Sequence, residues 1–395
     1  PIALPNKEQN IVENINLAGL TEDQNLIRAN VLELLDRTLP WPLIRQLDEK
    51  GEFPHEAYDA LAEAGFMGLF YPEEYGGMGG SHKDLTAFVE TLGYYYTGIA
   101  QAYMTTVIYA GMHVVKNGSE ALKREFVPKI ISGEVKLALA MSEPGTGSDV
   151  AGLKTSAVRD GDDYILNGQK IWITCAHVAD YLVVIAKTDP SAQRHRGLSV
   201  FLVDARAPGV EIRPLKMLGR KTTHANEIFL TDVRVPATHL LGAENGAWKS
   251  LMGCLNVERL CLSAISSGHC FKITDYAADY AKQRIQFDQP ISSFQVIQHK
   301  LADMAIMAET ARQATWRVAE LLDGGFDAVR ETSIAKIVSS ENNFRCADMG
   351  LQVMGGAGYS TEYDMQMFFR DSRVGPIGGG SNEIQRNIIA KLMDL

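Results

Sequence analysis

The stretch DDYILNGQKIWIT (162–174) is rich in strand-forming residues and has Asn167-Gly168 at its centre. Asn-Gly is a strong signal for a two-residue hairpin turn, so the stretch predicts two paired strands. Three further β-rich runs follow, separated by glycine and proline: GLSVFLVDA (197–205), GVEIRPL (209–215) and NEIFLTDVRV (226–235). Helices do not alternate with these runs, so the pattern predicts a compact β region and excludes a doubly wound sheet.

Helical patterns lie on both sides of this β region. Upstream, NLIRANVLELLDRTL (25–39) has apolar residues at spacings of three and four, and HEAYDALAEAGFMGL and DLTAFVETLGYYY follow it. Downstream, three long runs between residues 247 and 356 predict members of a helical bundle. The order predicts three domains: an N-terminal helical domain (1–134), a central β domain (135–245) and a C-terminal helical domain (246–395).

Composition excludes several classes of protein. The net charge of −10 argues against nucleic-acid binding, which depends on clustered Lys and Arg. No apolar run approaches the roughly 20 residues that span a bilayer, and the N-terminal residues lack the layout of a signal peptide. The five cysteines form no CxxC pair, so we expect buried free thiols, no metal site and a cytoplasmic location.

Two features of the β region have alternative interpretations. In MSEPGTGSDV (141–150), Gly145 and Gly147 match the start of a GxGxxG phosphate-binding pattern, but Val150 occupies its third glycine position. The segment is either an ordinary turn or a phosphate cradle. In KIWIT (170–174), strand alternation places Trp172 and Thr174 on one face, where the tryptophan either joins the core or walls a flat aromatic cofactor.

Glu258 is the anomaly of the downstream helices. It falls in phase with Leu251, Leu255, Leu262 and Ile265, and a carboxylate on an apolar stripe is rarely left unpaired. One interpretation is that Glu258 forms a buried ion pair with Arg259 or with a basic residue of another helix. The other is that Glu258 is a general base whose pKa is raised by burial.

Three later segments combine glycine or arginine with a helix boundary. Arg284 in QRIQFDQP (283–290) is either solvated or a phosphate ligand. The glycines of LQVMGGAGYS (351–360) predict a helix stop. The triplet in RVGPIGGGSNEIQR (373–386) precedes a predicted last helix, and three consecutive residues without side chains suggest that something needs the bare backbone.

In combination, these motifs resemble the acyl-CoA dehydrogenase family. The segments SEPGTGSDVAGLKT, YILNGQKIWIT, QRIQF, FQVIQHKLADM, QVMGGAGYS and SNEIQRNIIA match it in sequence and order. The resemblance implies an α+β fold with a central antiparallel β-barrel domain and a C-terminal four-helix bundle. It also implies FAD as cofactor, an acyl-CoA substrate, an electron-transfer flavoprotein as electron acceptor, and a homotetramer.

The resemblance also implies roles for individual residues. Met141, Ser142, Gly147, Ser148, Trp172 and Thr174 would contact the flavin and pyrophosphate, Gln295 the adenine side, and Ser381 and Glu383 the flavin. The FAD of an adjacent subunit would be reached by Arg284, Phe287, Gln352, Gly355 and Gly356. Ser148, Arg259 and Gly380 would bind the substrate. Asp288 stands where the family commonly has Gly, which leaves the conformation of that turn open.

The reaction implied is α,β-dehydrogenation: a carboxylate removes the α-proton while hydride leaves the β-carbon for flavin N5. Many members carry this base in the loop before the last helix, where this chain has Gly379. A subgroup resembling isovaleryl-CoA and long-chain acyl-CoA dehydrogenases carries it on the first bundle helix, as Glu258 stands here. We therefore expect Glu258 to be the base and the Gly379 amide to donate to the thioester carbonyl. The alternatives are an enoyl-CoA reductase and a flavoprotein of the same family that does not dehydrogenate.

Overall fold

The computed structural model describes residues 20–395, which form two compact units built from distant segments. The helical unit contains residues 20–45, 81–100 and 259–395. The β unit contains residues 46–80 and 101–258. The expected succession of helical, β and helical regions is confirmed, while the three domain boundaries given above stay a prediction.

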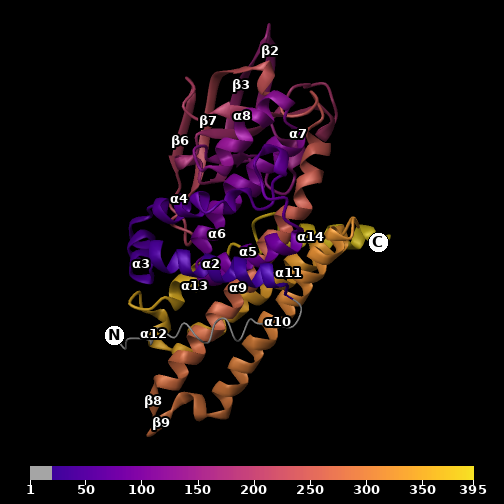
Figure 1. The fold of residues 1–395 in the computed structure, drawn as a ribbon. Coiled ribbons are helices and arrows are strands. Elements are labelled where there is room, and N and C mark those ends of the chain that lie inside the picture. Colours follow the sequence, from indigo (N-terminus) through magenta and orange to yellow (C-terminus); the bar gives the residue numbers. More distant parts are fainter. Residues whose placement is uncertain (1–19) are drawn as a thin grey trace. The chain divides into compact units, whose positions relative to one another are not determined.

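The β unit is organised around a seven-stranded sheet. Its order is β1-β4-β2-β3-β7-β6, with β5 paired to β4, and β2, β3, β7 and β6 lie side by side in Figure 1. The strands are β1 (Leu137–Ala140), β2 (Ser156–Asp160), β3 (Asp163–Thr174), β4 (Tyr181–Lys187), β5 (Leu198–Asp204), β6 (Val210–Pro214) and β7 (Ala225–Pro236). The sheet is mixed where a wholly antiparallel one was expected, because β1 pairs with β4 in parallel.

The predicted hairpin at Asn167-Gly168 is wrong, because β3 continues through both residues. The register between β3 and β7 shifts there, so the pair forms a bulge. Asn167 holds the bulge by exchanging hydrogen bonds with Asp232, at 3.0 and 2.9 Å. Gly168 is required because a Cβ atom on it would overlap Thr155. The hairpin that does occur joins β2 to β3 at residues 160–163.

Short helices complete the β unit. They are α4 (His55–Glu63), η1 (Phe66–Gly68), η2 (Glu73–Tyr75), α7 (Met112–Asn117) and α8 (Glu120–Ile131), together with a π-helix, η3 (Met104–Gly111). The Tyr71 hydroxyl donates to the Val107 carbonyl at 2.7 Å and occupies the space that a Cβ on Gly111 would need. A side chain inserted into the helix in this way accounts for the widened turn.

The helical unit is formed by α2 (Glu22–Thr38), α5 (His82–Tyr95), most of α9 (Ala247–Gln283), α10 (Gln295–Asp323), α11 (Val329–Met354), α12 (Gly356–Tyr359), α13 (Met365–Ser372) and α14 (Asn382–Leu392). Helices α9, α10 and α11 share an apolar cluster that contains Leu260, Val318 and Ala335. Helices α5 and α9 approach closely at two glycines: a Cβ on Gly93 would lie 2.5 Å from the Ile265 carbonyl, and one on Gly268 would overlap Glu90. Like α9, the helices α3 (Trp41–Lys50) and α6 (Thr97–Tyr103) have residues in both units.

A short hairpin, β8 (Ile285–Gln286) and β9 (Gln289–Pro290), connects α9 to α10 (Figure 1). Its two turn residues, Phe287 and Asp288, have φ values of 50° and 62°. Positive φ at both central positions is the signature of a type I′ turn, which asparagine and glycine normally occupy. The turn therefore forms without the glycine that the family commonly has, and Phe287 is 87% exposed at its tip.

Candidate cofactor and substrate sites

The loop that follows β1 is fastened to β3 in the β unit. The Ser142 carbonyl accepts a hydrogen bond from the Ile171 amide at 3.0 Å, and the Met141 carbonyl accepts one from Lys170 Nζ at 3.0 Å. A tight turn follows, closed by reciprocal bonds between Glu143 and Thr146. Beyond it, Gly147 and Ser148 are exposed, and a Cβ on Gly147 would meet nothing within 4 Å. This open turn leaves space for a ligand.

Trp172 has a backbone that β-strand residues rarely adopt. Its φ is 65°, and it lies in a second bulge of β3 against β7, between Lys170 and Ile173. The bulge interrupts the strict alternation that the sequence predicted for KIWIT. The indole is 56% exposed, so it is outside the core and available to a flat ligand, while Thr174 is half-buried two residues later. Strained residues of this kind cluster at functional sites.

Glu143 and Lys170 form a buried ion pair at the base of this loop, 2.9 Å apart. The side chains are 7% and 0% exposed. Burial acts to raise the pKa of Glu143, but Lys170 and the donors around the carboxylate outweigh it and hold that pKa below its ordinary value. Burial lowers the pKa of Lys170 to about 8 against the opposing effect of Glu143. Both groups are therefore charged at neutral pH.

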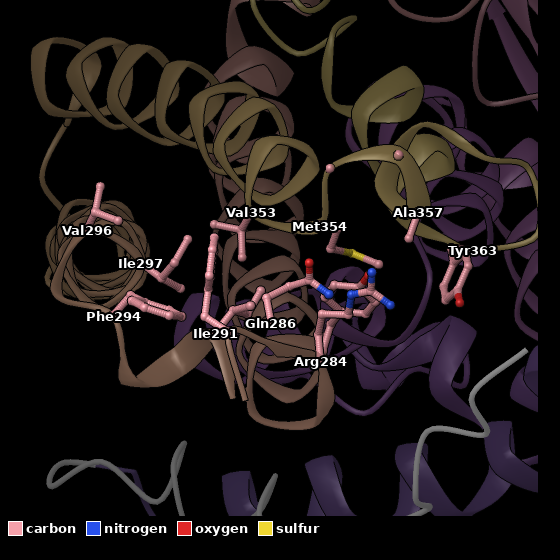
Figure 2. Close-up of a pocket in the computed structure, with 14 residues that line it drawn as sticks. Arg284, Gln286, Ile291, Phe294, Val296, Ile297, Val353, Met354, Ala357 and Tyr363 are labelled. Carbon is pink, nitrogen blue, oxygen red and sulfur yellow. The ribbon is translucent and has the colours of Figure 1, made fainter. Parts of the chain in front are cut away.

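A pocket of about 670 Å³ lies in the helical unit beside the β8–β9 hairpin (Figure 2). Four residues that the sequence assigned to the cofactor meet there: Arg284, Phe287, Gly355 and Gly356. Gln295 and Gln352 are exposed and adjacent in the chain to lining residues, but they do not line the pocket. Sequence reasoning missed Tyr280 and Met354, because apolar and aromatic residues in a helical pattern are normally core, and it missed Tyr363, which lies between α12 and α13.

The lining of this pocket suits a ligand with an aromatic end and an anionic end. In Figure 2, Phe294, Val296 and Ile297 form an apolar side, and the guanidinium of Arg284 lies toward Tyr363. Arginine pairs bidentately with phosphate oxygens. A Cβ on Gly355 or Gly356 would meet nothing within 4 Å, so the backbone there is open to close approach. The pyrophosphate and adenine of FAD fit this donor set.

The glycine triplet before α14 is a second cluster of the helical unit. Gly379 and Gly380 have φ values of 64° and 79°, a region that favours glycine. The Gly380 carbonyl accepts a hydrogen bond from the buried Gln385 side chain at 3.1 Å. A Cβ on Gly380 would lie 3.6 Å from Nη2 of Arg259, so the structure brings together two residues assigned to the substrate.

Ser381 has a structural role that the sequence did not predict: its hydroxyl caps α14 by accepting from the Ile384 amide at 3.4 Å. The next residue, Asn382, is buried and accepts from Lys336 Nζ at 2.8 Å, which fixes the start of α14 to α11. Glu383 is exposed in the first turn, where its own amide and then Ser381 lower the pKa of its carboxyl. A carboxylate at a helix N-terminus is favourable by itself, so capping alone accounts for these two residues.

Glu258 is half-buried on α9, in the part of that helix that belongs to the β unit. Two contacts from α7 fix the preceding turns: Lys116 Nζ donates to the Gly253 carbonyl at 2.7 Å, and His113 lies 3.3 Å from the Ser250 hydroxyl. Cys254, one turn before Glu258, lies 3.9 Å from His113 Nδ1.

The Cys254–His113 contact is not an activated nucleophile. Burial raises the pKa of Cys254 to about 11, and burial followed by nearby Lys116 lowers the pKa of His113 to about 4. A reactive cysteine needs the opposite shifts, a depressed thiol pKa and a protonated histidine. Neither cysteine nor histidine therefore competes with Glu258 for the role of the reactive group on this segment.

Comparisons with known proteins agree with the motifs. Three domains of acyl-CoA dehydrogenase match in order: the N-terminal domain over residues 21–134, the middle domain over 138–233 and the C-terminal domain over 245–393. In the described residues, no helix is long and apolar enough to cross a membrane.

Individual relatives span nearly the whole chain. A mitochondrial isovaleryl-CoA dehydrogenase of Pongo abelii is 35% identical over 377 residues, covering 94% of this chain and 89% of its own. A subunit of a caffeyl-CoA reductase–Etf complex of Acetobacterium woodii is also 35% identical, covering 94% and 98%. The structure of butyryl-CoA dehydrogenase from Megasphaera elsdenii superposes with a TM-score of 0.91 at 31% identity, covering 95% and 99%.

Proposed function

Because the chain belongs to the acyl-CoA dehydrogenase family of oxidoreductases, we propose that it dehydrogenates an acyl-CoA thioester at the α and β carbons. The observation that carries this proposal is that the chain has a glutamate at position 258 on α9 and a glycine at position 379 in the loop before α14. A carboxylate is therefore present on the first bundle helix, and the loop position where many family members carry the base has no side chain.

We propose FAD as the cofactor. Met141, Ser142, Trp172 and Thr174 would contact the flavin, and Arg284 would bind the pyrophosphate of an adjacent subunit's FAD in the pocket of Figure 2. When bound, FAD supplies a hydride acceptor. Two observations support this assignment. The exposed indole of Trp172, which has a left-handed backbone, is available to pack against a flavin, and Arg284 in the pocket is available to bind a pyrophosphate.

The residues of this chain supply the proton chemistry. Glu258 removes the α-proton, and a positioned carboxylate contributes about 10²–10⁴ in rate. The negative charge that develops on the thioester oxygen needs hydrogen-bond donors, each worth roughly 3 kcal/mol. The Gly379 amide is our candidate donor, because a backbone N–H can donate without any side chain. The left-handed conformation of Gly379 also favours glycine at this position. Arg259 and Gly380, which lie together, would bind the CoA portion.

The partners are proposed on similar grounds. An electron-transfer flavoprotein is our candidate electron acceptor, because one relative is named as part of a caffeyl-CoA reductase–Etf complex. A homotetramer is supported by Phe287, whose exposed ring lines a pocket that an adjacent subunit's FAD would fill. A cytoplasmic location is consistent with the five cysteines, all of which are buried thiols.

The test is anaerobic mixing of the purified holoenzyme with a panel of saturated acyl-CoA thioesters, followed by flavin absorbance. We expect bleaching by the wild type and none by Glu258→Gln, with FAD still bound. The matched control is Asp279→Asn, which removes an exposed carboxylate from the same helix. Flavin reduction at near-normal rates in Glu258→Gln would refute the assignment of the base.

An enoyl-CoA reductase is the second candidate, because two relatives of 35% and 34% identity are named as reductases. The same carboxylate, in its protonated form, would deliver a proton to the α-carbon. Reoxidation of chemically reduced enzyme by enoyl-CoA thioesters, with no bleaching by saturated ones, would favour this direction. A holoenzyme that responds to neither class would support a family member without dehydrogenase activity.

A further inference from the structure

The buried pair of Glu143 and Lys170 has more hydrogen bonds than a simple ion pair. Glu143 accepts three: from the Lys154 amide at 2.6 Å, from the Thr155 amide at 2.9 Å and from Lys170 Nζ at 2.9 Å. Lys170 also donates to the Met141 carbonyl at 3.0 Å. One carboxylate and one ammonium therefore make four hydrogen bonds, three of them to backbone groups.

These contacts close a loop at its base. The chain leaves β1 at Ala140 and returns at Lys154 and Thr155, just before β2. The carboxylate of Glu143 is near the start of this excursion and binds the two amides at its end. The loop 141–155 is thereby held as a closed unit, and Lys170 attaches it to β3.

The attachment lies directly before Trp172. The register of β3 against β7 shifts between Lys170 and Ile173, and the Ile171 amide in this bulge donates to the Ser142 carbonyl. The loop thus bonds directly to β3 within the bulge. Trp172 follows with φ of 65° and an exposed indole. A residue persists in such a conformation only where its surroundings determine it.

Stability alone does not explain the pair. Two charges withdrawn from water are expensive, and replacing a buried ion pair by apolar residues is often neutral or stabilising. A pair that also fixes the loop and the bulge has a geometric role that apolar residues could not reproduce, because they offer neither donors to Met141 nor acceptors for residues 154 and 155.

We propose that Glu143 and Lys170 are positioning residues, which form a clamp that holds Met141 and Ser142 against β3 and keeps Trp172 in its exposed conformation for the cofactor. The inference rests on the proposed FAD site, because Met141, Ser142 and Trp172 are the residues assigned to the flavin. Neither Glu143 nor Lys170 is among the residues assigned to the flavin or to the substrate.

The test compares Lys170→Met and Glu143→Gln with a matched control, Asp180→Asn. Asp180 has the same chemistry at the other end of β1: it accepts from the Lys136 amide at 2.9 Å and from Arg206 Nη2 at 2.8 Å. The dissociation constant for FAD is measured by titrating FAD-free protein, and the bound flavin spectrum and the unfolding temperature are recorded for each variant.

We expect the clamp variants to raise the Kd for FAD by about tenfold or more, the effect of losing one or two buried hydrogen bonds, and to change the flavin spectrum. Asp180→Asn should lower the unfolding temperature but keep the Kd within about twofold, since a cost confined to stability does not alter binding. A wild-type Kd and spectrum in Lys170→Met would overturn the inference, as would an equal loss of FAD affinity in Asp180→Asn. If Lys170→Met does not fold, Lys170→Arg and Glu143→Asp, which keep the charges but change the reach, provide the same comparison.

Hydrogen exchange in FAD-free protein separates this inference from the proposed function. Peptides covering residues 141–155 and 165–174 should exchange about tenfold faster in the clamp variants than in Asp180→Asn, because the amides of Lys154, Thr155 and Ile171 lose their partners. Equal exchange would overturn the clamp. A wild type that does not bind FAD would refute the cofactor proposal, and the exchange rates would still decide whether the clamp holds the loop.

Discussion

Gly380→Ala tests whether the glycine loop before α14 needs its bare backbone. Gly380 has a φ of 79°, where a side chain costs about 1–2 kcal/mol. Its Cβ would also lie 2.7 Å from Nε2 of Gln385, the group that donates to the Gly380 carbonyl. Gln385 is fully buried, so the displaced amide finds no water and its lost hydrogen bond costs about 1 kcal/mol more. We expect a total loss of about 2–3 kcal/mol.

The matched control is Gly378→Ala, two residues earlier in the same triplet. A Cβ there would lie 3.7 Å from the Val374 carbonyl, an ordinary contact, and the φ of Gly378 is outside the left-handed region. Such a site accepts alanine at little cost, since the change also reduces the conformational freedom of the unfolded chain. The two variants therefore differ in the backbone conformation of the substituted residue and in the contact with Gln385.

The assay is thermal unfolding of both variants, followed by steady-state kinetics. Gly380→Ala should unfold about 4–12 °C below wild type, at about 2–4 °C per kcal/mol for a unit of this size, and Gly378→Ala within about 2 °C. The new Cβ would also lie 3.6 Å from Nη2 of Arg259, an ordinary contact, so we expect Gly380→Ala to raise the KM for acyl-CoA through the displaced loop. Equal unfolding temperatures for the two variants would refute the reasoning.

Two further predictions concern the β unit. The pKa of His113 is lowered from 6.5 to about 4 by burial and by nearby Lys116, so the stability of the folded state is complete above about pH 6.5 and falls as the pH drops toward 4. The difference between these two pKa values corresponds to about 3 kcal/mol of stability. The variant His113→Gln should therefore flatten this part of the pH–stability curve, and an unchanged slope would contradict the lowered pKa of His113. Tyr71→Phe removes the donor to the buried Val107 carbonyl and should cost about 1–3 kcal/mol in denaturant unfolding. Gly111→Ala, whose Cβ would overlap the Tyr71 hydroxyl, should cost more, and the opposite ranking would refute our account of the π-helix.

The long helices were predictable from sequence because a period of three to four residues persists over many turns. The expected run 25–39 became α2, and the three downstream runs became α9, α10 and α11. Their ends were also readable: α11 stops at Met354, where Gly355 takes a φ of 60°. Local chemistry determines these features, so no knowledge of distant segments was needed.

The β region was harder to predict because distant residues decide its details. Asn167-Gly168 has the chemistry of a hairpin turn, but Asp232 and Thr155 convert it into a bulge within one strand. The Glu143–Lys170 pair was missed for the same reason, since 27 residues separate its members and neither is unusual by itself. The four residues that meet in the pocket of Figure 2 were found through a motif resemblance, and spacing alone would not have joined them.

Helix geometry bears on the choice between the two roles of Glu258. Consecutive positions of an α-helix point about 100° apart, and neighbouring residues do not face each other. Arg259 is buried in the helical unit and lies near Gly380, whereas Glu258 belongs to the β unit. The two neighbouring side chains therefore leave α9 in different directions, which is consistent with the separate roles proposed for them: Arg259 in substrate binding beside Gly380 and Glu258 in proton transfer.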